Sequence, residues 1–539
     1  MLPTVHELLQ DHVTLSVSCV DRLYINGYLP KMQRSGQLAY FLGQHLGGRI
    51  PSLAQLKPIH DRFVASVGAF AQRQGTCKMP FERGQRKDDI AAAHHRRFQA
   101  DEGVVLIGTA QERCSSFKSH KRSTPRGSVI FDFHREPVYV NHYYFYVQDA
   151  QWGPGFLKIG SYAPYPVKLC LNGHEWAKQQ LRHEGIGFES LDNGFLSCED
   201  PERLQQLCDQ LGSSDVQAFF DRWSRRLPWP LSEEDRAAGY EHRLTIWQME
   251  FSLTQIFDRP LRGREFFEQV IRENLDLGRP DRVDLVFPRR ITRRTPAPRF
   301  GYRTRVITQG VNPSLHIYYK SSHLKQYFKE GRGLRGELTI NNPLDFGINK
   351  GLENFDRLTA LGRQVNRKLQ EVETLSQHCS FSDRGLDRLH KPTVVGHQRA
   401  SAMRFGDPRV MALLQALCAF FHIPHGFRHR DLRPRVAQLL GRSLEQYTPG
   451  QMTYDLRRLR LKGIISRIAK THRYVVTTYG LKVALFFSKV YLRILRPGWC
   501  VLAETTHNFG QPLRRAFDRI QAEMDRLCRD ARLEPAANP

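Results

Sequence analysis

The most regular hydrophobic pattern in the chain lies between residues 405 and 497. Three segments place apolar side chains on one helical face: residues 409–422, 429–440 and 449–462. Thr448 is a suitable N-cap for the third helix, and Pro449 suits its first position. The pattern then changes to two short strands, residues 464–468 and 473–477, followed by another helix. It therefore predicts a small helical domain with a β-hairpin.

The third helix is expected to be amphipathic. Its apolar stripe consists of Met452, Leu456 and Leu459. At about 100° per residue, the opposite face carries Tyr454, Arg457, Arg458 and Leu461. A helix with a tyrosine and two arginines on its free face can enter the major groove of DNA. The tip of the hairpin carries Lys470, His472 and Arg473, which suit phosphate contacts.

This segment resembles the winged-helix family found in many bacterial regulators. The matching residues are Leu456, Leu459, Gly463, Ile464, Ile465, Arg467, Tyr474, Val476, Thr477 and Gly480. The resemblance covers about a sixth of the chain and implies a DNA-binding module, although winged helices also serve as protein-binding modules. The basic free face of the third helix and the basic hairpin favour DNA.

The remaining pattern predicts an α+β multidomain chain. Its segments are an N-terminal α/β region (1–100), a central mixed α/β domain (101–285), a basic β-rich region (286–349), a helical connector (350–404), the C-terminal winged helix-turn-helix (405–497), and a last helix with a tail (498–539). Strands are expected at residues 13–19 and 104–108, a hairpin at 138–148 and 155–161, and helices at 175–184, 201–211, 214–225, 244–275 and 350–378.

Composition adds a strong positive charge to this picture. The 539 residues include 80 lysines and arginines against 54 aspartates and glutamates, a formal net charge of +26. Because each neutralised phosphate releases counterions, DNA or RNA is the expected partner. The alternatives are a basic protein without such a partner and one bound to an anionic membrane, but no basic amphipathic helix favours a membrane.

The compartment is expected to be the cytoplasm. There is no run of 18 apolar residues, and the N-terminus lacks the pattern of a signal peptide. The ten cysteines form no Cys-x-x-Cys pair, which fits reduced thiols and argues against a zinc finger.

A second basic segment precedes the predicted connector. It carries Arg289, Arg290, Arg293, Arg294, Arg299, Arg303 and Arg305, seven arginines within 17 residues. Aromatic residues nearby, among them Tyr318, Tyr319, Tyr327 and Phe328, offer surfaces on which bases can stack. Nucleic-acid contact is therefore expected here as well, with a solvated basic loop as the alternative.

The first candidate active site lies in the central domain. No P-loop, Gly-x-Ser-x-Gly or His-Glu-x-x-His motif is present. His174 and Glu175 open a predicted helix, and Asp192 lies in a turn shortly after. A metal-dependent nuclease or strand transferase needs two or three carboxylates around Mg²⁺, which Asp132, Asp149 and Glu175 are candidates to supply. Each of these residues also has an ordinary structural explanation as a cap, a turn former or a satisfied polar group.

A second candidate lies in the β-rich region. Strands with Tyr327 and Glu337 faintly resemble the second half of plasmid and phage replication initiators. That resemblance implies Tyr327 as the nucleophile and Glu337 as a metal ligand, but the paired histidines of those proteins are absent. DNA-facing strands without chemistry are the alternative.

Two classes of function therefore remain. The protein either processes DNA, as a nuclease, transposase-like or replication-initiation protein of a mobile element, or binds DNA without chemistry, as a regulator or nucleoprotein structural factor. Size favours the first class. Residues 510–530 show apolar spacing that fits a homodimer seam or docking on the chain's own core.

Overall fold

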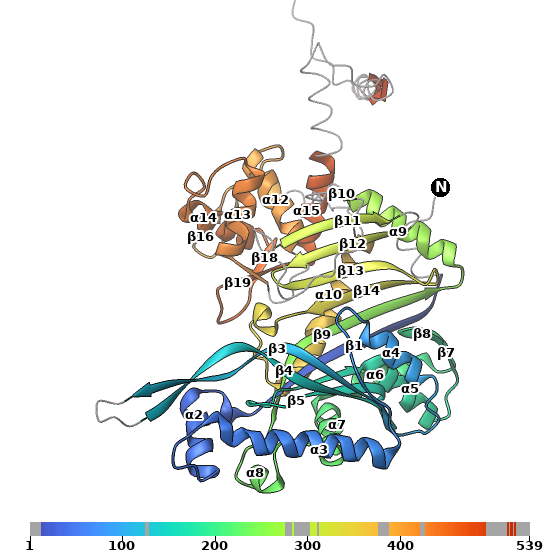
Figure 1. The fold of residues 1–539 in the computed structure, drawn as a ribbon. Coiled ribbons are helices and arrows are strands. Elements are labelled where there is room, and N and C mark those ends of the chain that lie inside the picture. The colour runs from blue at the N-terminus through green and yellow to red at the C-terminus, as the bar shows by residue number, and fades with distance from the viewer. Residues whose placement is uncertain are drawn as a thin grey trace, which may run out of the picture. The chain divides into compact units, whose positions relative to one another are not determined.

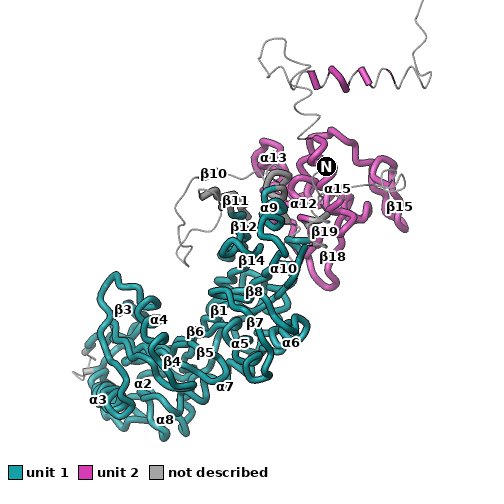
Figure 2. Tube along the Cα trace, turned by 90° about the vertical axis from the view of Figure 1, so that its right-hand side faces the viewer, with its two compact units in different colours: residues 1–269, 281–370 teal, residues 270–280, 371–539 magenta. Residues whose placement is uncertain are grey.

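A computed structural model describes residues 12–123, 129–274, 283–284, 302–309, 312–375, 388–420 and 426–491, with a few positions between 515 and 526. The chain divides into two compact units, coloured separately in Figure 2. Unit 1 comprises residues 1–269 and 281–370, and unit 2 comprises residues 270–280 and 371–539. Among the described residues, no helix has both the length and the apolar character that a membrane crossing needs.

Unit 1 is built on one twelve-stranded sheet (Figure 1). Its strands are β1 (Val13–Tyr28), β2 (Lys78–Pro80), β3 (Gly103–Ser123), β4 (Val129–Asp149), β5 (Gly153–Gly160), β6 (Val167–Asn172), β9 (Arg243–Phe257), β10 (Val283–Asp284), β11 (Tyr302–Gln309), β12 (Asn312–Tyr319), β13 (Ser322–Lys329) and β14 (Gly333–Ile340). The order is β10-β11-β12-β13-β14-β9-β1-β6-β5-β4-β3-β2, antiparallel except for the β10–β11 and β2–β3 pairs. The prediction of a mixed α and β chain is confirmed, as are the two predicted strands and the β4–β5 hairpin.

Strand β9 corrects the prediction of a helix over residues 244–275. Only the second part of that segment is helical, as α9 (Pro260–Asn274). Its first part pairs with β1 on one side and β14 on the other. The apolar residues Leu244, Ile246, Met249 and Phe251 suit strand alternation interrupted by one bulge as well as helical spacing. Pairing with β1 and β14 makes this segment a strand instead of a helix. The hydrogen bonds that stabilise it come from residues far away in the chain.

Besides α9, unit 1 contains further helices, several of which pack on the apolar side chains of the sheet. They are α2 (Ser35–Tyr40), α3 (Lys57–Gln74), α4 (Lys87–His95), α5 (Gly173–His183), α6 (Pro201–Gln210), α7 (Ser213–Arg226), α8 (Glu233–Ala237) and α10 (Phe355–Leu375). Phe63 and Phe70 of α3, for example, meet Tyr143 and Phe145 of β4 edge to face. Helices α5, α6 and α7 confirm the three helices expected between residues 175 and 225.

Helix α10 is more than the polar connector that its composition suggested. Its side chains Leu358, Leu361 and Val365 are buried in the main core. A Cβ atom at Gly362 would lie 2.2 Å from the ring of Phe251 on β9, so the helix backbone directly contacts the sheet. The sheet is the surface that its apolar stripe covers, and the buried Asn366 on the same helix donates a hydrogen bond to the Phe251 carbonyl oxygen at 3.2 Å.

Unit 2 contains helices and a three-stranded sheet in the order helix, strand, helix, helix, strand, strand, helix. The elements are α12 (Pro408–Phe420), β17 (Phe427–Arg428), α13 (His429–Leu439), α14 (Pro449–Leu461), β18 (Ile465–Arg467), β19 (Arg473–Val476) and α15 (Thr478–Val490), preceded by the hairpin of β15 (Thr393–Val395) and β16 (Gln398–Ala400). Thr448 caps α14, since its hydroxyl accepts a hydrogen bond from the Gln451 amide. The predicted helices and strands of this segment are therefore present. Most of residues 510–530, where a dimer seam was expected, lie outside the described residues.

Candidate functional site

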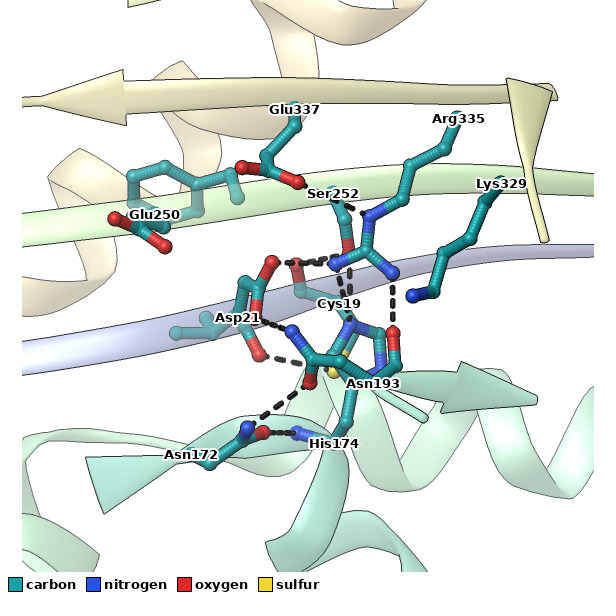
Figure 3. A network of polar contacts seen from close by, with 12 residues as sticks. Cys19, Asp21, Asn172, His174, Asn193, Glu250, Ser252, Lys329, Arg335 and Glu337 are labelled. Carbon is teal, nitrogen blue, oxygen red and sulfur yellow. Dashed lines mark hydrogen bonds and ion pairs between the residues drawn. The ribbon is translucent and has the colours of Figure 1, made fainter. Parts of the chain in front are cut away.

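The candidate site lies where β1 is irregular at the centre of the sheet. The pairing of β1 with β9 shifts register between Val20 and Leu23, so Asp21 stands in a bulge. Its side chain is only 1% exposed. A carboxylate buried to this degree must have cationic or hydrogen-bonding partners, because leaving it unpaired costs several kcal/mol. Those partners come from three other parts of the chain: the start of α5, the turn at Asn193, and β14 (Figure 3).

The first partners come from the start of α5. The Asn172 side chain caps this helix by accepting hydrogen bonds from the amides of His174, at 2.8 Å, and Glu175, at 3.2 Å. Its own amide group donates to the Asn193 side chain at 2.9 Å, and Asn193 in turn donates to Asp21. Asn193 lies in the turn between β7 (Phe188–Leu191) and β8 (Gly194–Cys198). The cap and the turn therefore hold His174 and Asn193 beside the bulge.

The main countercharge of Asp21 is Arg335 on β14, which is fully buried. Its guanidinium group forms an ion pair with Asp21 and donates a hydrogen bond to the Asn193 carbonyl oxygen. Nε of the same group lies 3.4 Å from the Glu337 carboxylate. Burial on its own raises the pKa of Asp21, but Arg335 and then His174 outweigh it and hold this pKa below its ordinary value.

Three carboxylates meet at this point, and we call Asp21, Glu250 and Glu337 the carboxylate cluster. One oxygen from each lies within 4.8 Å of the other two. The registers explain the meeting, because Glu337 pairs with Ser252 and Glu250 with Thr339 on adjacent strands. Burial, followed by the charges of Asp21 and Glu337, raises the pKa of Glu250 to about 7. Near neutral pH, the cluster thus holds a proton that a cation can displace.

Tyr327 on β13 adjoins this cluster. Its hydroxyl group donates a hydrogen bond of 3.1 Å to Glu337, and the ammonium group of Lys325 lies 3.9 Å from the centre of its ring. Burial and the nearby Glu337 raise the pKa of Tyr327. The phenol is therefore protonated at neutral pH, and Glu337 is the group positioned to take its proton.

The cluster fits a hard divalent cation in its donor atoms. Carboxylate oxygens are the usual ligands of Mg²⁺, at about 2.1 Å, and of Ca²⁺, at about 2.3–2.6 Å. Oxygens up to 4.8 Å apart would have to close around either ion, by less for Ca²⁺ than for Mg²⁺. Arg335 already compensates part of the negative charge, which limits the affinity that the site can reach.

Three of the candidates named from the sequence come together here: His174, Tyr327 and Glu337. Nε2 of His174 lies 2.9 Å from the Ser252 hydroxyl group and 3.4 Å from the Arg335 guanidinium group. Asp192 directly precedes Asn193, but its side chain is exposed, and only its backbone amide is engaged, by Glu330 at 3.2 Å.

The metal ligands expected from Asp132, Asp149 and Glu175 do not form a group. Glu175 pairs with Lys178 at 2.7 Å, and Asp132 with Arg122 at 3.0 Å. Asp149 is fully buried between Arg222, at 2.5 Å, and the Trp223 indole, at 2.7 Å. Each carboxylate has a local structural partner, so these three do not form a shared metal site. Among the described residues, the acidic group that could hold an ion is the carboxylate cluster.

Two members of the cluster, Asp21 and Glu250, were missed in the sequence, and the neighbouring Arg335 was not proposed as a site residue. Asp21 gave a signal as the lone acidic residue of its strand, and Arg335 stands two positions before Glu337. Glu250 gave no signal in the sequence, because the segment that contains it was predicted to be a helix. Only strand pairing brings residues 21, 250 and 337 to one place.

A second candidate surface lies on α14 in unit 2. Tyr454 is 47% exposed and Arg457 is also exposed, as predicted. Arg458 and Leu461 are buried, however, which corrects their assignment to the free face. Arg458 donates hydrogen bonds to the carbonyl oxygens of Ser401, at 3.3 Å, and Ala402. The chain around β15 and β16 covers this side of α14, and the helical wheel could not anticipate that cover.

The hairpin between β18 and β19 carries the other basic residues expected to contact DNA. Lys470 and His472 are exposed, and Lys470 adopts a left-handed conformation with φ of 57° at the tip. The Arg473 guanidinium group reaches back to the Gly426 carbonyl oxygen at 3.1 Å. Exposed Arg467 donates to the Thr471 carbonyl oxygen at 2.7 Å, which stiffens the hairpin.

The expected arginine segment is described only in part. Arg289, Arg290, Arg293 and Arg294 lie outside the described residues. Arg303 and Arg305 lie in β11, opposite Tyr318 and His316 of β12.

Comparison of the chain with protein-family models, curated proteins and solved structures returned no match. The two sites therefore have to be interpreted from their own chemistry.

Proposed function

We propose that unit 2 is a winged helix that binds duplex DNA, with α14 in the major groove and the β18–β19 hairpin on the phosphates. The observation that carries this proposal is the free face of α14, where Thr453, Tyr454 and Arg457 are exposed on one side. A tyrosine and an arginine on a free helix face are suited to base-edge contact. Lys470 supplies positive charge, and His472 a ring N–H donor, for the contacts that a wing makes with the backbone.

The interior of unit 2 supports this proposal because it holds α14 rigidly. Asp455 is fully buried on the packed side of the helix. It accepts hydrogen bonds from the Tyr447 hydroxyl group, at 2.6 Å, and from Arg409, at 2.8 Å. On another side, Lys462 donates to the carbonyl oxygens of Arg388, at 2.7 Å, and Lys391. A recognition helix fixed in this way presents its free face without a cost of ordering on binding.

Replacement of Arg457 tests this proposal. Arg457→Ala should weaken binding to duplex DNA by about 1–3 kcal/mol if it contacts a base, or lower the slope of log affinity against log salt by about 0.9 if it contacts a phosphate. Arg73→Ala, which removes an exposed arginine from α3 in unit 1, is the matched control. Unchanged affinity and slope in Arg457→Ala would refute DNA contact by this helix.

The carboxylate cluster supports a second activity, metal-dependent cleavage of the bound DNA. In that reaction the Tyr327 oxygen would attack a backbone phosphorus, Glu337 would take the phenolic proton, and the P–O bond to the departing strand would break. The released oxygen would take a proton from water. A divalent cation bound by the cluster would neutralise charge on the phosphate. This activity rests on the hydrogen bond between Tyr327 and Glu337 and on the proximity of the three carboxylates.

Nicking assays separate this enzyme from a regulator or nucleoprotein factor that binds DNA without chemistry. The purified protein is incubated with supercoiled and single-stranded DNA in Mg²⁺, Mn²⁺ or EDTA. Metal-dependent nicking that disappears in Tyr327→Phe and Glu337→Gln would support cleavage. Glu175→Gln is the matched control, because Glu175 pairs with Lys178 outside the cluster. Binding without nicking in every metal would leave only the non-catalytic class.

A further inference from the structure

One face of the central sheet carries a continuous row of polar and aromatic side chains across six strands. The strand registers define it, since opposed residues and residues two apart share a face. Lys158 of β5 opposes Lys168 of β6, and Tyr24 of β1 opposes Gln248 of β9. Glu337 of β14 opposes Lys325 of β13. We call this surface, which runs from Lys158 to Tyr327, the polar sheet face.

Several side chains of this face are partly exposed, although Ser252 and Arg335 at the cluster end of the row are buried. Lys168, Tyr24, Trp247 and Lys325 are half-buried. The intervening residues Leu23, Ile25, Met249, Leu169 and Leu338 all belong to the main core. Such alternation is typical of an antiparallel sheet with one packed face and one wet face. At about 4.8 Å between strands, the row extends for about 24 Å.

Aromatic rings lie in the middle of the row. Trp247 stands in the second bulge between β9 and β1, where the register shifts after Tyr24. Its ring meets Tyr24 edge to face at 5.9 Å, and the Lys168 ammonium group lies 4.1 Å from its centre. A bulge beside a binding surface commonly serves to re-aim a side chain. Trp247 thereby joins the face that Lys168 and Tyr24 share.

The lysine end of the row suits an anion. Lys158 and Lys168 oppose each other directly, an arrangement of like charges that destabilises a sheet when nothing neutralises it. Glu112 pairs with Lys158, but it also pairs with Lys87. Burial, and then the charge of Lys158, lowers the pKa of the adjacent His142 to about 4. Lys87 and Lys158 therefore share the Glu112 carboxylate.

We propose that the polar sheet face binds single-stranded DNA, with Trp247 and Tyr24 stacking on bases and Lys158 and Lys168 contacting phosphates. Aromatic rings beside lysines on an open sheet are a recurrent platform for single strands. The row ends at the carboxylate cluster and Tyr327, so a strand lying on it would reach those groups. The choice of DNA as the ligand rests on the proposed function. Duplex DNA bound by unit 2 would be the source of the single strand.

The test uses a fluorescein-labelled dT20 oligonucleotide and a duplex of equal length, with binding followed by anisotropy. Lys168→Glu should weaken dT20 binding about tenfold or more and lower its salt slope by about 0.7, while duplex binding is retained. Trp247→Phe should weaken dT20 binding severalfold. It should also remove the quenching of Trp247 fluorescence that base stacking causes when dT20 binds. Lys57→Glu, which reverses an exposed lysine of α3, is the matched control.

Arg457→Ala makes the two proposals distinguishable. It should weaken duplex binding and leave dT20 binding unchanged, the reverse of Lys168→Glu. Equal losses for both probes in both variants would mean a single site and would overturn the sheet proposal. Unchanged dT20 affinity in Lys168→Glu and Trp247→Phe with native melting curves would also overturn it, as would tighter binding of U20 RNA than of dT20.

Discussion

Arg335 and Asp21 form a buried ion pair although 314 positions separate them in the chain. Each side chain is 1% exposed. The pair joins β14 to the bulge of β1 across β9, and the Asn193 turn is attached to both residues. It is therefore the link that holds the carboxylate cluster together.

Removing one member of this pair should be costly. Asp21→Asn removes the main countercharge of the buried Arg335 guanidinium group, so we expect a loss of about 3–5 kcal/mol in the free energy of unfolding. Urea denaturation measures it. Asp61→Ala, which breaks the exposed pair of Lys57 and Asp61, should cost less than about 1 kcal/mol. If Asp21→Asn and Arg335→Met are additive in the double variant, the two residues are not coupled.

The free energy of unfolding should decline as the pH rises from about 5 toward 7, because Glu250 loses its proton in this range. Its pKa is about 7 in the folded protein and near its ordinary value of 4.5 when unfolded. The folded state therefore binds more protons in this window, and deprotonation costs stability that is intact below the unfolded pKa. Urea denaturation at several pH values should show a flatter profile for Glu250→Gln than for the wild type. Parallel profiles would argue against a raised pKa.

A divalent cation should act against this pH trend. Mg²⁺, Mn²⁺ or Ca²⁺ bound at the cluster displaces the proton of Glu250, so added metal should stabilise the protein more at pH 8 than at pH 5. Differential scanning fluorimetry with and without metal measures the shift in melting temperature. Glu250→Gln should remove it and Glu175→Gln should keep it. Equal shifts in both variants would place the metal elsewhere.

Arg457 and Arg458 should behave oppositely although they are neighbours. Arg458→Ala leaves the carbonyl oxygens of Ser401 and Ala402 without a donor, which should cost about 1–3 kcal/mol in the stability of unit 2. Arg457→Ala should leave stability within about 0.5 kcal/mol, because Arg457 is exposed. Calorimetric melting curves compare them. A larger loss in Arg457→Ala would contradict the orientation of α14.

Gly480 should be irreplaceable for steric reasons. A Cβ atom at this position would lie 1.9 Å from the Ile464 carbonyl oxygen, so Gly480→Ala has to push the start of α15 away from the strand region. We expect a loss of about 1–3 kcal/mol or more in the stability of unit 2. Gly450→Ala is the control, since a Cβ atom there would lie 3.9 Å from the Thr448 hydroxyl oxygen. Equal melting temperatures for both variants would disprove the clash.

How far the sequence could be interpreted differed between the two units. In residues 405–497 the helices, the Thr448 cap and the hairpin followed from local periodicity, because each depends on neighbours within a few positions. In residues 244–257 the same reasoning predicted a helix, since an apolar segment with a bulge satisfies either spacing. Glu250 was lost as a candidate with that error.

The sequence by itself determined the local elements of unit 2, the positive charge, and three members of the central site, His174, Tyr327 and Glu337. Tertiary structure decided which of them meet. The registers of β1, β9 and β14 bring Asp21, Glu250 and Glu337 together, and the chain around β15 and β16 buries Arg458. Side-chain chemistry and short-range spacing can be inferred from the order of residues. Long-range strand pairing cannot, because it depends on the sum of contacts across the whole sheet.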